Sequence, residues 1–118
     1  MSRRTERLAD QLRSEISQVL REQATDPRIR LVTVTRVDVS PDLSNAIVFW
    51  SALEVKGAEG AEAIQQGLDS AAPFVRRCLA RVLALRRVPA LRFRYDPSLV
   101  LGDQMLSLLR SLQDDGEA

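Results

Sequence analysis

Pro73 constrains the fold of this chain more than any other residue, because it stands inside a helical pattern. Proline fixes φ and has no N–H, and the residue before it is driven away from the helical region. We therefore expect a helix over residues 61–70 to end at an interhelical kink, Ala71-Ala72-Pro73, and a second helix to begin after it. Apolar residues recur at helical spacing after this kink and predict a face that packs on the rest of the chain. They are Phe74, Val75, Cys78, Leu79, Val82, Leu83 and Leu85.

Arginines dominate the segment that follows the kink. Seven arginines and no acid lie between Arg76 and Arg94. Five of them occupy positions that the apolar stripe of the second helix leaves free: Arg76, Arg77, Arg81, Arg86 and Arg87. Pro89 is expected to end this helix, and Arg92 and Arg94 then alternate with apolar residues in the period of a strand with one buried face.

The charge is distributed unevenly along the chain. Four acids and one lysine give residues 54–69 a net charge of −3, whereas seven arginines give residues 76–94 a charge of +7. The domain is therefore predicted to be polarised, although the net charge of the whole chain is only +1.

The rest of the chain completes an α+β pattern. Residues 4–23 predict a helix, and its apolar stripe consists of Leu8, Leu12, Ile16, Val19 and Leu20. Residues 31–39 and 43–53 predict two strands that pair antiparallel across the turn Ser40-Pro41-Asp42. The valines of the first strand change parity, which a β-bulge would reconcile. Trp50 of the second strand is expected in the core.

This order of elements, with a further helix after Pro97, predicts one domain over residues 1–113 and a short disordered acidic tail over residues 114–118. The economical arrangement is an α+β domain in which a three-stranded sheet is covered on one face by helices.

The inventory of reactive residues argues against an enzyme. The chain has no histidine, which removes the commonest general base and metal ligand. Its one cysteine, Cys78, lies on an apolar helix face and is expected to be a buried thiol. The acids show no metal-ligand spacing, and there is no glycine-rich phosphate loop. We expect no catalytic residue, metal or cofactor, and, without a signal peptide or membrane-spanning run, a cytoplasmic protein.

The order of elements resembles the K-homology (KH) RNA-binding module with the type II strand order. Such modules usually carry a GxxG loop between two helices, and no GxxG occurs here. Six segments are similar, in order and spacing, to the ribosome-binding factor A family over residues 3–112. They are Asp26-Pro27-Arg28-Ile29, Val32–Val37, Val39–Ala46, Phe74-Val75-Arg76, Leu85–Phe93 and Tyr95-Asp96-Pro97-Ser98.

The resemblance implies a non-catalytic bacterial factor that binds the free 30S small ribosomal subunit late in maturation. Such a factor supports processing of the 16S rRNA precursor, leaves before translation and is associated with growth in the cold. Its implied partners are 16S rRNA and neighbouring ribosomal proteins, with a ribosome-assembly GTPase promoting release, and the chain is expected to be a monomer. In this family an Ala-x-Gly kink replaces the GxxG loop. Pro73 stands at the position of that glycine, which predicts a stiffer kink.

Arginines are the candidate RNA-binding residues, because the planar guanidinium group binds phosphate well. The hypothesis is that the start of the first helix, the helix after the kink and the third strand form one basic surface against rRNA. Its members are Arg3, Arg4, Arg7, Arg76, Arg77, Arg81, Arg86, Arg87, Arg92 and Arg94, with Arg28 and Arg36 as secondary candidates. Arg13, Arg21 and Arg110 are expected to be solubilising charges.

Three further possibilities stay open. Arg3, Arg4 and Arg7 would equally suit a plain solvated helix start. A KH-type protein acting on messenger or small RNA would have the same fold. A protein-interaction module would instead use the acidic segment over residues 59–69.

Overall fold

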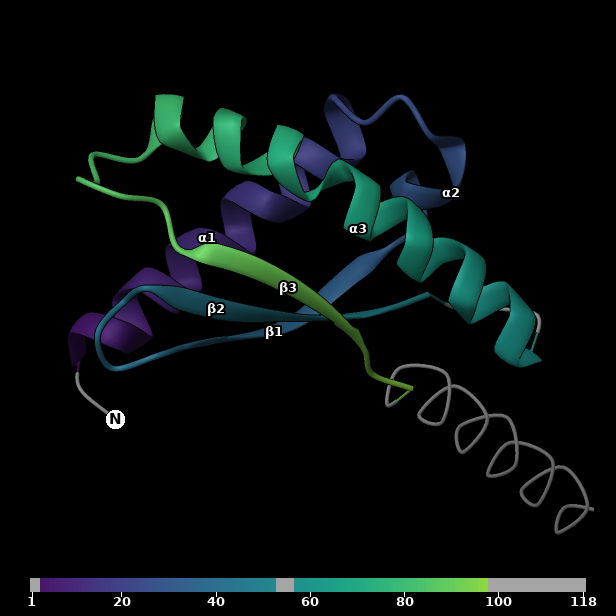
Figure 1. Cartoon of the computed structure of the whole chain (residues 1–118), viewed down its shortest axis with the longest axis horizontal. Helices are drawn as coiled ribbons and strands as arrows, with labels where there is room; N and C mark the ends of the chain where they lie inside the picture. The colour runs from purple at the N-terminus through teal and green to yellow at the C-terminus, as the bar shows by residue number, and fades with distance from the viewer. Residues whose placement is uncertain (1–2, 53–56, 98–118) are drawn as a thin grey trace, which may run out of the picture.

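The computed structural model describes residues 3–52 and 57–97 (Figure 1). The elements are α1 (Arg3–Glu22), α2 (Pro27–Arg30), β1 (Thr33–Val39), β2 (Asn45–Ser51), α3 (Gly57–Val82) and β3 (Ala90–Tyr95). The predicted terminal helix and the tail over residues 114–118 lie outside the described residues.

The three strands form one sheet in the order β1-β2-β3. β1 and β2 pair antiparallel, as predicted, and β2 and β3 pair parallel because α3 carries the chain back across the sheet. Figure 1 shows α1 and α3 on the same side of the sheet, with the other side free of both helices. This arrangement confirms the predicted α+β fold with helices on one face.

A β-bulge, which the sequence left as one way to reconcile the parities of the valines, lies in β1. The register with β2 shifts between Val34 and Arg36, so that Thr35 is the extra residue. Its hydroxyl lies 3.3 Å from the carbonyl oxygen of Phe49 and 3.1 Å from the Asp96 carboxylate. Val34 and Val37 are therefore both buried although their parities differ.

The core lies between the sheet and the helices. The predicted stripe of α1 is buried throughout, and Trp50 of β2 is fully buried, as expected. Trp50 Nε1 donates a hydrogen bond to Gln65 Oε1 at 2.7 Å, and Gln65 Nε2 donates to the carbonyl oxygen of Phe93 at 2.7 Å. The Trp50 ring centroid is 4.7 Å from that of Tyr95. Gln65 thus fixes α3 to both β2 and β3.

The prediction that a helix ends at Ala71-Ala72-Pro73 is wrong, because α3 continues through Pro73. Leu68 and Val75 are fully buried, so both halves of the helix pack against the domain. That packing outweighs the roughly 3 kcal/mol that a proline costs inside a helix. Pro73 lies on the exposed side, where water can reach the carbonyl group that has lost its N–H partner. Figure 1 shows that the axis of α3 changes direction along its length, and a proline inside a helix is a usual cause of such a bend.

The second half of α3 is shorter than predicted. The helix ends at Val82, so Arg86 and Arg87 lie in the connection over residues 83–89 and not on the helix. Val88 of this connection is buried, and its carbonyl oxygen accepts a hydrogen bond from Arg76 Nη2 at 3.1 Å. The burial of Val88 and its hydrogen bond with Arg76 hold the connection, and neither contact can be predicted from helical periodicity.

The short helix α2 was not predicted. Asp26 caps it by accepting a hydrogen bond from the Arg28 N–H at 3.0 Å, and Pro27 occupies its first turn. An aspartate directly followed by proline is the sequence signal for such a start, because the aspartate side chain accepts a hydrogen bond from a free helix N–H and proline has no N–H to satisfy.

Candidate nucleic-acid interface

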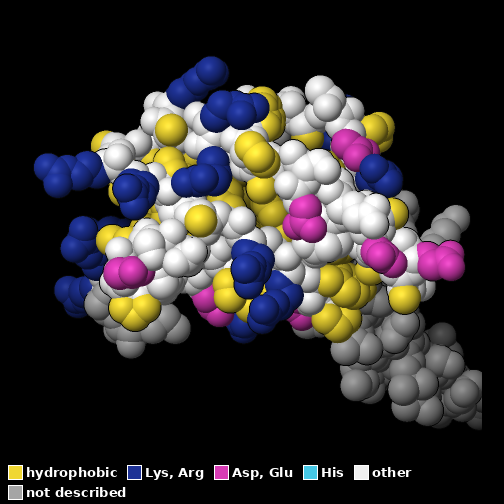
Figure 2. Space-filling model, in the orientation of Figure 1, with side chains coloured by type: hydrophobic (Ala, Val, Ile, Leu, Met, Phe, Trp, Pro, Cys, Tyr) yellow, Lys and Arg dark blue, Asp and Glu magenta, His cyan; other side chains and the backbone are white. Residues whose placement is uncertain are grey.

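Seven of the predicted arginines lie at the end of the molecule where α1 begins and α3 ends. We call this surface the basic end, and it consists of Arg3, Arg4, Arg7, Arg77, Arg81, Arg86 and Arg87. All seven are exposed. Figure 2 shows most of the basic side chains toward this end and most of the acidic ones toward the opposite end, where α3 begins. The predicted polarisation of the domain is visible on the face that Figure 2 shows.

The start of α1 and the connection after α3 meet in a groove at the basic end. Arg3, Arg4 and Arg7 line this groove of about 440 Å³ together with Leu43 and Leu85. Because Arg86 and Arg87 follow Leu85 directly, arginines that are far apart in the sequence lie near the same groove.

None of the seven arginines of the basic end forms an ion pair within residues 3–52 and 57–97. Guanidinium groups without a protein partner are available for phosphate oxygens, to which they can donate two parallel hydrogen bonds. The first turn of α1 adds the positive end of its helix dipole to the same surface.

Two other predicted arginines are used within the protein. Arg76 donates to the carbonyl oxygen of Val88 and so holds the connection before β3. The Arg28 guanidinium lies 2.8 Å from the Asp26 carboxylate. Hydrogen bonds from Arg28 lower the pKa of Asp26, and the same carboxylate raises the pKa of Arg28. These side chains have structural roles at α2 and at the end of α3.

The remaining three arginines lie on the face of the sheet that the helices leave open. Arg92 and Arg94 alternate with the buried Phe93, as the strand pattern predicted, and therefore point away from α3. Arg36 lies across the sheet on the same face, because it pairs with Phe49, which in turn pairs with Arg94. The single basic surface expected from the sequence is thus divided into the basic end and this open face.

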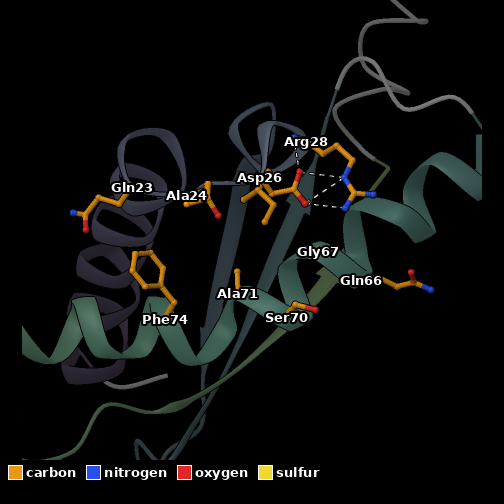
Figure 3. A pocket seen from close by; sticks show the side chains of 11 residues that line it. Gln23, Ala24, Asp26, Arg28, Gln66, Gly67, Ser70, Ala71 and Phe74 are labelled. Atoms are coloured by element: carbon orange, nitrogen blue, oxygen red, sulfur yellow. Dashed lines mark hydrogen bonds and ion pairs between the residues drawn. The ribbon is translucent and has the colours of Figure 1, made fainter.

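A second groove, of about 580 Å³, runs between α2 and the middle of α3 (Figure 3). Ala71 of the expected kink lines it, with Phe74 and the Asp26–Arg28 pair on opposite sides. Gly67 allows α2 to approach, because a Cβ at this position would lie 3.2 Å from Asp26 Oδ2. This groove was not predicted, although a glycine inside a helical pattern is a known signal of close packing.

The described part of the chain has no group of three or more His, Cys, Asp or Glu residues arranged to hold a metal ion. Cys78 is buried, as predicted, and its Sγ lies 3.4 Å from Gln23 Oε1. No helix within the described ranges is both long enough and apolar enough to cross a membrane.

Comparisons with known proteins agree on one family. The family model described as ribosome-binding factor A matches residues 4–109. Ribosome-binding factor A of Pseudomonas syringae pv. syringae (strain B728a) is 44% identical over 118 residues, which cover 97% of this chain and 83% of that protein. The protein of the same name from Pseudomonas fluorescens (strain SBW25) is 42% identical over 118 residues, covering 97% of this chain and 88% of that protein.

Solved structures give the same result. The crystal structure of ribosome-binding factor A from Thermus thermophilus is similar with a TM-score of 0.67 and 30% identity, covering 77% of this chain and 93% of that one. A Thermus thermophilus ribosome binding factor A homology model, fitted into a cryo-EM map of a 30S complex, is similar with a TM-score of 0.61 and 30% identity. It covers 75% of this chain and 91% of that chain. The chain therefore belongs to the ribosome-binding factor A family.

Proposed function

We propose that this protein binds the free small ribosomal subunit and that its basic end contacts phosphates of 16S rRNA. The observation that carries the proposal is the set of seven exposed arginines at one end of the fold, none of which is neutralised by an acid in the described residues. A relative from Thermus thermophilus has been fitted into the map of a 30S complex, which supports the same partner for this chain.

The arrangement favours recognition of charge and shape over reading of bases. Exposed arginines can contact phosphates along a folded RNA without reading its bases. Sequence-specific recognition of RNA instead needs unpaired bases that enter pockets of the protein. Selectivity would then come from the fit of the basic end to the surface of the immature subunit.

The finer parts of the proposal rest on family membership. The protein acts without catalysis in the cytoplasm, as a monomer, late in subunit maturation. It supports processing of the 16S rRNA precursor and growth in the cold, and a ribosome-assembly GTPase promotes its release.

The test compares two double variants that remove the same charge. Arg77→Gln with Arg81→Gln changes the basic end, and Arg13→Gln with Arg21→Gln changes exposed arginines elsewhere on α1 and is the control. Affinity for purified small subunits is measured at several salt concentrations. We expect the first variant to bind about tenfold more weakly and to lower the salt slope by about 1.5, because two phosphate contacts are lost.

The control variant is expected to bind nearly as the unmodified protein does. Equal losses in both variants would mean that only overall charge matters and would contradict a role for the basic end. Unchanged binding in the first variant would show that the basic end is a solvated surface.

A further inference from the structure

The open face of the sheet combines an aromatic side chain with three arginines. The register places Phe49 between Arg36 on β1 and Arg94 on β3. In the neighbouring row, Ile47 lies between Asp38 and Arg92. Phe49 and Ile47 are each partly exposed, and no helix covers this side of the sheet in the part of the chain drawn with ribbons in Figure 1.

Arg36 is held in a fixed position on this face. Its guanidinium carbon lies 4.2 Å from the centroid of the Phe49 ring, and its Nε lies 3.3 Å from Asp38 Oδ1. The ring lies below the guanidinium and the carboxylate contacts one edge, so that both contacts favour an orientation in which the side chain can bind a partner. The side chain is still 62% exposed, which leaves its outer surface and terminal nitrogens available.

The charge of the open face suits a polyanion. Arg92 and Arg94 point outward from β3 and have no acidic partner among the described residues. Two acids lie nearby. Asp38 is paired with Arg36, and the Asp96 carboxylate lies within hydrogen-bond distance of the Thr35 hydroxyl. Residues two positions apart on a strand have Cα atoms about 6.6 Å apart, so the side chains of Arg92 and Arg94 can reach neighbouring phosphates of one RNA strand.

We propose that the open face binds an unpaired segment of rRNA, with a base stacked on the Arg36–Phe49 pair and the adjoining phosphates on Arg92 and Arg94. Guanidinium planes and aromatic rings are the surfaces on which unpaired bases stack, and here the Arg36 guanidinium lies over the Phe49 ring with its outer surface exposed. A paired helix would bury its bases and would leave the Arg36–Phe49 pair without a stacking partner. This inference rests on the proposed function and adds a contact on a surface separate from the basic end.

The experiment uses the full-length protein bound to free small subunits and measures two quantities. The first is affinity as a function of salt, and the second is the dimethyl sulfate reactivity of unpaired rRNA bases with and without protein. Two open-face variants are compared with the Arg13→Gln and Arg21→Gln control. Arg92→Gln with Arg94→Gln removes the phosphate contacts, and Phe49→Leu removes the ring beneath Arg36 while it keeps every charge.

The arginine variant is expected to bind about tenfold more weakly and to lower the salt slope by about 1.4, since a single-stranded phosphate contributes about 0.7. Phe49→Leu is expected to bind roughly fivefold more weakly with an unchanged salt slope, because stacking and not charge is lost. The unmodified protein is expected to protect a small set of unpaired bases from dimethyl sulfate. This protection should disappear in both variants. The control should keep both the affinity and the protection.

Three outcomes would overturn the inference. Open-face variants that bind and protect like the unmodified protein would leave the proposed function intact and remove only this contact. If the open-face variants bound more weakly but protected the same bases as the unmodified protein, the partner of the open face would be a ribosomal protein and not unpaired RNA. An unmodified protein that does not bind the subunit at all would overturn the proposed function together with this inference.

Discussion

The two faces of the sheet are built from the same strands and have opposite roles. On the covered face, Val48, Trp50 and Phe93 are buried beneath the helices. On the open face, the residues beside them are Phe49, which carries Arg36 over its ring, and the outward-pointing Arg94. Because successive side chains of a strand point to opposite sides, a shift of one position separates a residue that stabilises the fold from one that is available for a partner.

The largest expected difference between the faces is in stability. Trp50→Ala should lower the free energy of unfolding by about 3–5 kcal/mol, because it opens a cavity in the core and removes a buried hydrogen bond. Phe49→Ala, one residue away, should cost about 1 kcal/mol or less, since the open face has only partial burial to lose. Urea unfolding of both variants measures the difference. Equal losses would mean that the open face is also covered.

A smaller effect is expected where α3 is fixed to the covered face. Gln65→Ala should destabilise the protein by about 1–3 kcal/mol, because Trp50 Nε1 and the Phe93 carbonyl oxygen both lose their partner. Gln66→Ala, at the next and exposed position, is the matched control and should change stability by less than about 0.5 kcal/mol. A Gln65→Ala variant as stable as the control would show that water replaces these hydrogen bonds.

The smallest effect is expected at the turn that joins β1 to β2. Hydrogen bonds from Ser40 and then Ser44 lower the pKa of Asp42 from 3.8 to about 2. The ionised carboxylate therefore adds stability that is fully present above pH 3.8 and is lost as the pH falls toward 2. Thermal unfolding at about pH 6 and about pH 2.5 should show a smaller decrease in Asp42→Ala than in the unmodified protein. An identical decrease in both would place the acid sensitivity elsewhere.

The sequence predicted those parts of the fold that depend on local patterns. The stripe of α1 and the alternation in β3 follow from the period of apolar residues. The burial of Trp50 was expected because a lone tryptophan is more often a core residue than a ligand. All three predictions were confirmed. The change of parity in the valine-rich strand left a bulge as one way to reconcile its two faces, but the structure was needed to place the bulge at Thr35 and to show which valines face inward.

The predictions that failed depend on contacts between distant residues. Pro73 should end a helix on local grounds, but the burial of Leu68 and Val75 on either side keeps α3 continuous. The end of the helix at Val82 is similarly fixed by the connection that Arg76 holds.

The candidate site shows the same limit. The arginines were identified from the sequence, but their division between the basic end and the open face follows from strand register and from which side the helices cover. The periodicity of β3 predicts that Arg92 and Arg94 share one face of the strand, whereas only the tertiary structure shows that α1 and α3 leave this face uncovered.

The most direct test of the account is sucrose-gradient co-sedimentation of the purified protein with free small subunits and with intact ribosomes, at low and at high salt. We predict that the protein travels with free small subunits only and that this binding falls steeply as salt rises, because exposed arginines release counterions from rRNA phosphates. Absence of binding to free subunits, or binding that salt does not weaken, would contradict the account.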